Sequence, residues 1–254
     1  MQENKVKRMI RSGQAVFGCF TRYADSNLTE LLSLQGFDFL VFDAEHGPIE
    51  PRDCLQMVRS AELHGITPIV RPTTNQKPIL LRYLDTGVQG VLVPMVCTVA
   101  DAHAVVHATK FQPLGSRGLA GSRSADYGQK FSLPEYAKFS NEQTLVVVQI
   151  ETVEAIQALP QIVNVDAVDV IFVGPADLSQ SLGVTGQMQH PKLQQAIDRI
   201  QEIVAESDKG LGIMVGNADA ANKWVDRGAK FIAITIEAMV KAGCRPYLNA
   251  VRDH

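Results

Sequence analysis

The amino-acid sequence predicts a single (β/α)₈ barrel, an α/β TIM-barrel fold, that spans residues 1–254. Eight short apolar runs alternate with segments of helical spacing, and 254 residues is the size of one such barrel. The runs 146–150 and 168–173 are separated by one helix's length, which is the spacing of a right-handed βαβ unit. An open doubly wound sheet is the alternative. It is weakened because no Gly-x-Gly-x-x-Gly motif follows the first apolar run.

The first half of the chain alternates strand and helix after a polar amphipathic opening. Gly36 follows a segment of helically spaced leucines, and we expect it to end that helix. The expected strands are 15–20, 39–42, 68–70 and 91–93, and the expected helices are 28–34, 51–64, 78–85 and 99–109.

The second half begins with a longer irregular section, residues 111–133, and loops of that length usually carry function. A short helical piece follows it, and the alternation then resumes. The expected strands are 146–150, 170–173, 211–215 and 231–235, and the expected helices are 152–163, 218–226 and 237–251. No linker or low-complexity tract interrupts the pattern, so we expect one domain.

The composition favours a small-molecule partner. The net charge of -3 and the absence of any lysine or arginine run give no electrostatic footprint for nucleic acid or an anionic membrane. The opening residues are charged and no apolar stretch is long enough to cross a bilayer, so we expect a cytoplasmic protein. The four cysteines are dispersed without a Cys-x-x-Cys pair, which favours free thiols over disulfides or zinc.

Two of the apolar runs lead into a carboxylate, Glu151 in one case and Asp177 in the other. Because the carboxyl ends of parallel strands meet at one end of a sheet, we expect these side chains to converge beside Gly174 and Ala176. Such a pair is a candidate site for a hard divalent cation with open positions. The alternative is that Glu151 caps the following helix and Asp177 begins the next one, as acidic residues often do.

His46 is the only histidine at an expected strand end, and it shares a short turn with Asp43. We expect Asp43 to orient the imidazole and stabilise its protonated form, which makes His46 the candidate acid or base. His103 and His107 have the spacing of a metal pair, but we expect an exposed helix face because they lie on a helix outside the barrel. Arg71 ends an apolar strand, where its burial requires a carboxylate neighbour or a carboxylate substrate.

Two absences narrow the chemistry. None of the expected strand cores contains the lysine that a Schiff-base aldolase needs, so the electron sink is expected to be a metal. The segment 235–238 reads Thr-Ile-Glu-Ala instead of the Gly-rich turn typical of phosphate-binding barrels, so we do not expect a phosphorylated substrate.

Six linked motifs run in order from about residue 13 to residue 237. They are Phe37-Asp38-Phe39 with Asp43-Ala44-Glu45-His46, Val70-Arg71-Pro72, Val93-Pro94-Met95-Val96, Gly115-Ser116-Arg117-Gly118, Val148-Gln149-Ile150-Glu151 and Gly174-Pro175-Ala176-Asp177-Leu178. Together they resemble the HpcH/HpaI group of class II pyruvate aldolases. The stretch from 243 onward matches that group poorly.

The resemblance implies a (β/α)₈ barrel with a divalent metal ion, Mg²⁺, Mn²⁺ or Co²⁺, held by Glu151 and Asp177. It also implies that Arg71 contacts the oxygens of pyruvate with Gln149 beside them, and that His46, oriented by Asp43, is the acid/base group. The pyruvate carboxylate is then met by backbone N–H groups of the turn made by Gly174, Pro175, Ala176 and Asp177.

The resemblance further implies a homo-hexamer, a trimer of dimers, in which Asp85 reaches a neighbouring active site. The loop 117–128 departs from the better-known members, in which it helps to bind the distal end of the aldehyde. Arg123 in this loop is a candidate for binding a terminal carboxylate, with a surface arginine as the alternative. Phe20 and Met214 are expected to form apolar walls that exclude water.

The leading hypothesis is a metal-dependent aldolase that cleaves or forms 4-hydroxy-2-oxo acids, with pyruvate and an aldehyde as the other partners. A metal-stabilised pyruvate enolate is the expected intermediate, with Arg71 beside its oxygen and His46 moving the proton of the 4-hydroxyl group. One alternative keeps the enolate in a related lyase, for example an oxaloacetate decarboxylase. The other is a non-catalytic barrel that binds an oxo acid, which the intact acid/base set disfavours.

Overall fold

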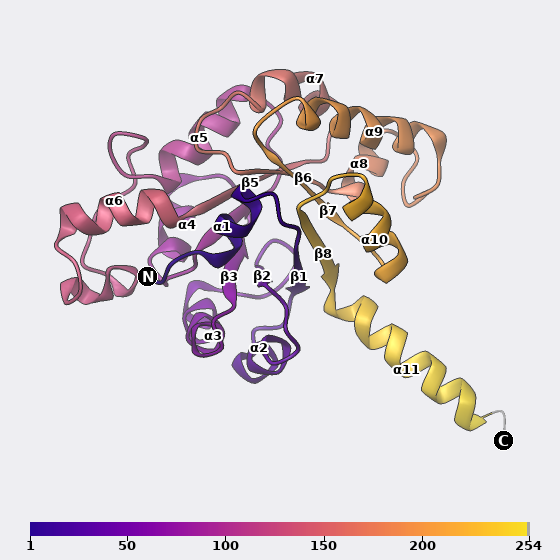
Figure 1. Cartoon of the computed structure of the whole chain (residues 1–254), viewed down its shortest axis with the longest axis horizontal. Coiled ribbons are helices and arrows are strands. Elements are labelled where there is room, and N and C mark those ends of the chain that lie inside the picture. The colour runs from indigo at the N-terminus through magenta and orange to yellow at the C-terminus, as the bar shows by residue number, and fades with distance from the viewer. Residues whose placement is uncertain (253–254) are drawn as a thin grey trace.

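The computed structural model describes residues 1–252, in which eight parallel strands close into one barrel (Figure 1). Each strand pairs with the next along the chain, and β8 pairs with β1 to close the barrel. The predicted fold class is confirmed. The strands are β1 (Val16–Thr21), β2 (Phe39–Asp43), β3 (Thr67–Arg71), β4 (Gly90–Val93), β5 (Leu145–Ile150), β6 (Val170–Val173), β7 (Gly210–Met214) and β8 (Phe231–Thr235).

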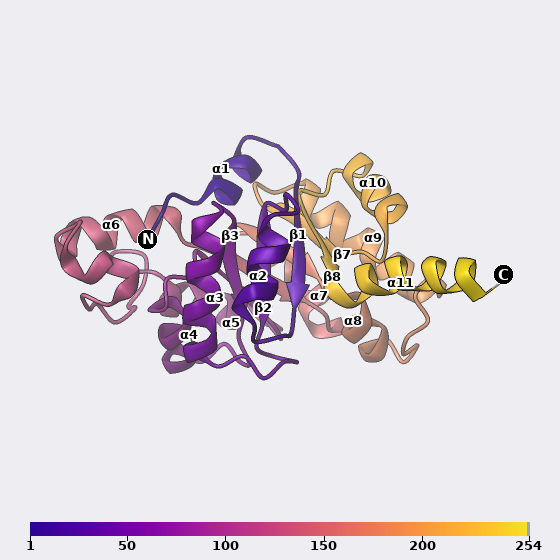
Figure 2. The same ribbon diagram turned by 90° about the horizontal axis from the view of Figure 1, so that it is seen from below.

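Helices surround the barrel on its outside (Figures 1 and 2). They are α1 (Lys5–Arg11), α2 (Ser26–Ser33), α3 (Pro51–Leu63), α4 (Lys77–Leu84), α5 (Val99–Thr109), the 3-10 helix η1 (Arg123–Gly128), α6 (Leu133–Gln143), α7 (Val153–Ile162), α8 (Pro175–Ser181), α9 (Pro191–Ala205), α10 (Ala218–Asp226) and α11 (Ile236–Arg252). The expected elements omit α8 and α9. α8 begins immediately after β6, because Gly174 ends the strand segment and Pro175 suits the first helical position.

Aromatic side chains fill the interior of the barrel. Phe39 and Phe231 stack with their ring centroids 4.0 Å apart, and Phe172 meets Phe231 edge to face at 5.9 Å. Gly18 lies opposite Phe39 in the register of β1 and β2, and a Cβ at Gly18 would lie 2.2 Å from the Phe39 ring. The absent side chain therefore makes room for a large ring, and the closely packed rings leave the barrel a filled core.

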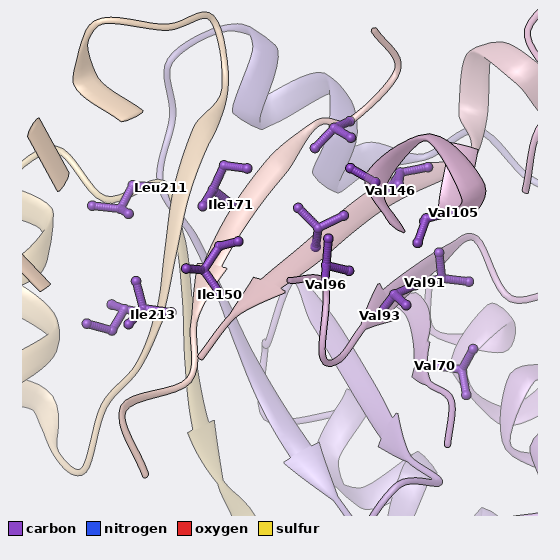
Figure 3. Packing of buried hydrophobic residues seen from close by; sticks show 14 of the residues in the cluster. Val70, Val91, Val93, Val96, Val105, Val146, Ile150, Ile171, Leu211 and Ile213 are labelled. Carbon is purple, nitrogen blue, oxygen red and sulfur yellow. The ribbon is translucent and has the colours of Figure 1, made fainter. Parts of the chain in front are cut away.

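Branched aliphatic side chains form a second layer between the strands and the helices (Figure 3). Val146, Ile150 and Ile171 belong to this outer layer, whereas the alternate residue Val147 faces the interior. All four are fully buried. Each strand is thus covered on both faces, which is why the strand sequences are apolar runs and do not alternate with polar residues.

The chain closes one end of the barrel and sends its last helix away from it. α1 lies at the end where the strands begin, and its Val6 is buried among the interior residues (Figure 2). α11 leaves the barrel after β8 and projects outward (Figures 1 and 2). Its apolar residues Val240, Tyr247, Leu248 and Val251 are exposed. Among the helices formed by residues 1–252, none has the length and apolar content needed to cross a membrane.

Candidate active site

The inward-facing positions of three strands end in buried polar side chains at the mouth of the barrel. On β3, the interior residue Ile69 is followed two positions later by Arg71, and on β5 Val147 is followed in the same way by Gln149. Asp43 takes the equivalent last position of β2. Because side chains of a strand alternate between its faces, the pleat gathers an acid, a guanidinium and an amide at one place.

Asp43 holds the guanidinium of Arg71. Nε and Nη2 of Arg71 donate to the two carboxylate oxygens of Asp43 at 2.9 and 2.7 Å, which is a bidentate pair between residues opposite each other in the β2–β3 register. The Arg71 guanidinium carbon also lies 5.2 Å from the centroid of the Phe20 ring, and Nη1 is 3.5 Å from Gln149 Oε1. The carboxylate neighbour that burial of Arg71 requires is therefore Asp43.

Glu151 follows β5 directly and is only 2% exposed. Its Oε1 accepts a hydrogen bond from the backbone N–H of Met95 at 2.7 Å, and its Oε2 contacts the side-chain amide of Gln149. Met95 has a φ of 54°, a left-handed conformation that costs a non-glycine residue about 1 kcal/mol or more. Burial raises the pKa of Glu151, and the negative charge of Asp177 raises it further.

Asp177 comes from the first turn of α8, which begins at the carboxyl end of β6. Gly174 joins the strand to this helix, and a Cβ at Gly174 would lie 2.9 Å from Glu151 Oε2 and 3.0 Å from Gln149 Nε2. Only glycine lets the backbone approach the carboxylate this closely. The turn that carries Asp177 is thereby held against Glu151, and the two acids repel each other.

These residues fit a hard divalent cation. Mg²⁺ is typically bound through one or two carboxylates while substrate and water fill its other positions, and Mn²⁺ favours the same oxygen donors. A cation held by Glu151 and Asp177 would offset the repulsion by Asp177, which adds to the effect of burial in raising the pKa of Glu151. Within residues 1–252 no group of three or more His, Cys, Asp or Glu side chains is placed to hold a metal, so a cation here would rely on these two acids and a bound ligand.

His46 lies in the turn after β2, with its side chain half exposed. It lines a cavity of about 540 Å³ together with Arg22, Tyr23, Ala24, Asp25, Pro48 and Glu237. Its backbone N–H donates to Asp43 Oδ1 at 3.3 Å, whereas its ring atom Nε2 is 3.7 Å from Oε2 of Glu45. Asp43 therefore meets His46 at the main chain, and Glu45 is the carboxylate beside the imidazole.

The two expected wall residues differ in their surroundings. Phe20 is buried and lies under the guanidinium of Arg71 while its ring stacks on Phe172 at 5.9 Å. Met214 is the last residue of β7 and is only partly buried against the interior cluster. Phe20 thus supports the site from below, and Met214 lies at its rim.

The structure does not bring Asp85 and Arg123 to the mouth of their own barrel. Both lie beside the connection between α4 and β4, at the end where the strands begin. Asp85 accepts a hydrogen bond from Arg117 Nη2 at 2.9 Å. Arg123 donates to the carbonyl of Thr86 at 2.8 Å and pairs with Glu62. Arg123 is therefore held in a largely buried ion pair and is not a free surface arginine.

Two groups at the mouth were not expected from the sequence, the side chain of Glu45 and the backbone N–H of Met95. Glu45 lies two positions beyond Asp43. Because strand side chains alternate between two faces, the inward position of Asp43 also predicts an inward side chain at Glu45. The N–H of Met95 left no such signal, because its direction depends on a backbone conformation that is uncommon for methionine.

The closed barrel has two acids, Glu151 and Asp177, near an arginine that is held by Asp43. This arrangement is that of an enzyme of the (β/α)₈ class. The sequence profile described as HpcH/HpaI aldolase/citrate lyase matches residues 16–242. The chain is 37% identical over 248 residues to the 4-hydroxy-2-oxo-heptane-1,7-dioate aldolase of Escherichia coli (strain ATCC 8739), covering 98% of this chain and 94% of that protein.

Solved structures agree with the sequence match. An HpcH/HpaI aldolase/citrate lyase family protein from Burkholderia cenocepacia J2315 superposes with a TM-score of 0.92 at 29% identity, covering 98% of this chain and 99% of that chain. Citrate synthase SbnG superposes with a TM-score of 0.88 at 27% identity, covering 97% of each chain. The chain belongs to the HpcH/HpaI aldolase/citrate lyase family, and the predicted class, a carbon–carbon lyase of the aldolase type, is confirmed.

Proposed function

We propose that this enzyme cleaves 4-hydroxy-2-oxo acids to pyruvate and an aldehyde, and that it needs a divalent cation to do so. The observation that carries the proposal is the position of Arg71, Glu151 and Asp177 around one mouth, where a 2-oxo acid would present its carboxylate and keto oxygens. The name of the Escherichia coli relative describes an aldolase of a 4-hydroxy-2-oxo acid, which supports the same substrate class for this chain.

Glu151 and Asp177 would hold the cation, Mg²⁺, Mn²⁺ or Co²⁺, which supplies a Lewis acid that polarises the keto group of the substrate. Arg71 contributes a fixed positive charge at the substrate oxygens, and its bidentate pair with Asp43 means that it needs no reorientation during the reaction. Gln149 bridges the two groups, since it contacts both Arg71 and Glu151.

His46 acts as the acid/base group. In the cleavage direction its imidazole takes the proton of the 4-hydroxyl group, the C3–C4 bond breaks and the aldehyde carbonyl forms. The bonding electrons stay on the three-carbon fragment as an enolate, which becomes pyruvate when C3 takes up a proton. The turn at Gly174, Pro175, Ala176 and Asp177 orients the substrate carboxylate with the free N–H groups of the first turn of α8. Phe20 and Met214 limit the access of water.

We also propose that the protein is a homo-oligomer, and the hexamer remains the expected state. α11 supports assembly because its apolar residues stay exposed in the part of the chain from 1 to 252 (Figure 1). Asp85 and Arg123 lie together at the end of the barrel opposite the mouth, so we propose that they serve the active site of a neighbouring subunit. Size-exclusion chromatography with light scattering measures the assembly, and a monomer would contradict this proposal.

A cytoplasmic location is proposed on the state of the thiols. Cys19, Cys54, Cys97 and Cys244 are all unpaired among the described residues, and Cys19 and Cys54 are buried. Free cysteines are usual in a reducing compartment. Labelling of the thiols in intact cells, followed by mass spectrometry, measures their redox state.

The function is tested by pyruvate release from a panel of 4-hydroxy-2-oxo acids, before and after treatment with EDTA. We expect activity to fall to background in EDTA and to return when Mg²⁺, Mn²⁺ or Co²⁺ is added. Unchanged turnover after complete metal removal would refute the metal-dependent mechanism. Oxaloacetate is assayed at the same concentration, and faster pyruvate release from oxaloacetate than from every aldol substrate would identify a decarboxylase instead.

A further inference from the structure

Glu45 presents a buried carboxylate oxygen that has no hydrogen-bond partner. Its Oε2 is shielded from solvent and accepts no hydrogen bond. The oxygen lies 3.2 Å from Nε of Arg71, but that N–H is directed at Oδ1 of Asp43, 2.9 Å away. An unsatisfied buried acceptor destabilises a protein, and more so when it is charged. A donor for Oε2 is therefore expected close by.

The donor in reach is the imidazole of His46. Its Nε2 is 3.7 Å from Oε2 of Glu45, about 0.8 Å longer than an ordinary hydrogen bond. The His46 side chain is 50% exposed, whereas that of Glu45 is 18% exposed, so the ring has room to move and the carboxylate does not. A small rotation of the imidazole closes the gap.

We propose that Glu45 is the positioning residue for His46. This inference rests on the proposed function, in which His46 exchanges a proton with the 4-hydroxyl group. Glu45 Oε2 accepts the hydrogen of Nε2, which fixes the ring and leaves Nδ1 with a free electron pair toward the substrate. The hydroxyl proton then moves to Nδ1 as the C3–C4 bond breaks, and the imidazolium formed faces a carboxylate. When His46 passes its proton on, the original state returns.

The surroundings of Glu45 suit this task. Burial raises the pKa of its carboxyl, while the positive charges of Arg71 and His46 act in the opposite direction. The nearby acids Glu151 and Asp43 raise the pKa further. A carboxylate of raised pKa is a better hydrogen-bond acceptor. Arg71 keeps the Glu45 carboxylate in place while donating its own hydrogen bonds to Asp43.

Two variants and one matched control test the proposal. Glu45→Gln removes the charge at constant size, and Glu45→Asp keeps the charge but shortens the reach by one methylene. The control, Glu202→Gln, changes an exposed acid on α9 that pairs with Arg199. We expect kcat to fall about 10- to 100-fold in both Glu45 variants, with KM within about twofold of the wild-type value. We expect Glu202→Gln to keep the wild-type kcat.

A second readout is spectroscopic and uses the metal-free protein. Proton NMR of the imidazole N–H groups, with His46 assigned through His46→Gln, should show a His46 ring N–H that exchanges slowly with solvent. The signal should vanish in Glu45→Gln and Glu45→Asp and persist in Glu202→Gln. Absence of this signal in the wild-type protein, or its survival in both Glu45 variants, would overturn the proposal, as would a loss confined to KM.

The test separates this inference from the proposed function. If His46→Ala retained full turnover, the base assigned to His46 would be wrong, yet the NMR experiment would still report on the contact between Glu45 and His46. If His46→Ala abolished turnover while both Glu45 variants kept the wild-type kcat, the assignment of His46 as the base would be supported. The positioning role of Glu45 would then be refuted.

Discussion

The two ends of the barrel each contain a cluster of buried charges, and the clusters have opposite signs. At the mouth, Asp43, Glu45, Glu151 and Asp177 surround the single guanidinium of Arg71, with His46 at the edge. At the other end, Lys7 and Lys110 share the carbonyl of Thr144, at 2.8 and 2.6 Å, and Asp169 is the one carboxylate in the cluster. Acids exceed cations at the mouth, and lysines exceed acids at the other end.

The comparison shows two ways of relieving an excess of buried charge. Lys110 is fully buried, and burial together with the charge of Lys7 places its pKa well below the ordinary value, so it gives up its proton readily. At the mouth, burial raises the pKa of Glu45 and Glu151, and the negative charge of Asp177 raises the pKa of Glu151 further. The low pKa of Lys110 lets the closed end lose a proton readily, whereas we propose that the open end accepts a cation and a substrate.

Asp177→Asn offers the strongest test of the difference. We expect kcat/KM to fall by about 10³-fold or more, because the variant loses one of the two proposed ligands of the cation and about 4 kcal/mol of transition-state stabilisation with it. Mn²⁺ binding measured by calorimetry should weaken in parallel. The metal-free variant should be at least as stable as the wild type in urea, since one of two repelling charges is gone.

The control for this variant is Asp219→Asn, which changes an exposed acid in the first turn of α10. It should leave both activity and Mn²⁺ affinity as they are in the wild type. If Asp177→Asn also kept wild-type activity and Mn²⁺ affinity, the acidic excess at the mouth would have no functional meaning.

Asp169→Asn should instead affect stability alone. Asp169 accepts a hydrogen bond from Lys7 at 2.9 Å and another from the backbone N–H of Val146 at 2.9 Å. Removing its charge leaves Lys7 buried without a counter-ion, so the free energy of unfolding should fall by about 3–5 kcal/mol. Turnover of the folded variant should not change, because the site lies at the other end of the barrel.

Urea unfolding and pyruvate release measure these two effects on the same preparation. The exposed neighbour Asp166 provides the matched variant, Asp166→Asn, for which less than about 0.5 kcal/mol is expected. A drop in turnover of the folded Asp169→Asn protein would show that the two ends are coupled, and the comparison would have to be abandoned.

The sequence was sufficient for the fold and for the part of the site that follows strand register. Alternating apolar runs predict the barrel, and the period of two places Asp43, Arg71 and Gln149 on its inner side, where the structure has them. The pairing of Asp43 with Arg71 was foreseen only as a need for some anion, because it depends on which strands become neighbours.

The remaining features depend on contacts between distant parts of the chain. Lys7 and Lys110 read as ordinary polar residues of helices or their ends, and nothing nearby in sequence marks them as buried neighbours of one carbonyl. The sequence also does not predict that α11 projects away from the barrel, because the periodicity of its apolar residues also suits a helix packed on the barrel. Asp85 and Arg123 were expected to serve an active site, and only the folded chain shows that both lie at the far end of their own barrel.

The smallest expected effect concerns the pH dependence of stability. The pKa of Lys110 is lowered in the folded protein, so between that value and the ordinary value of 10.5 the unfolded chain binds more protons than the folded one. The contribution of Lys110 to the free energy of unfolding should therefore rise with pH in this window, with a slope of at most about 1.4 kcal/mol per pH unit.

Lys110→Met should flatten this rise, which urea unfolding at a series of pH values measures. Lys7 still donates to the carbonyl of Thr144 in the variant, so only the carbonyl of Asn141 loses its lysine donor. Lys138→Met changes an exposed lysine on α6 and should keep the wild-type slope. An unchanged slope in Lys110→Met would mean that Lys110 keeps its proton in the folded state. Loss of a proton would then not be the way in which this end of the barrel reduces its buried charge, and the contrast with the mouth would be wrong.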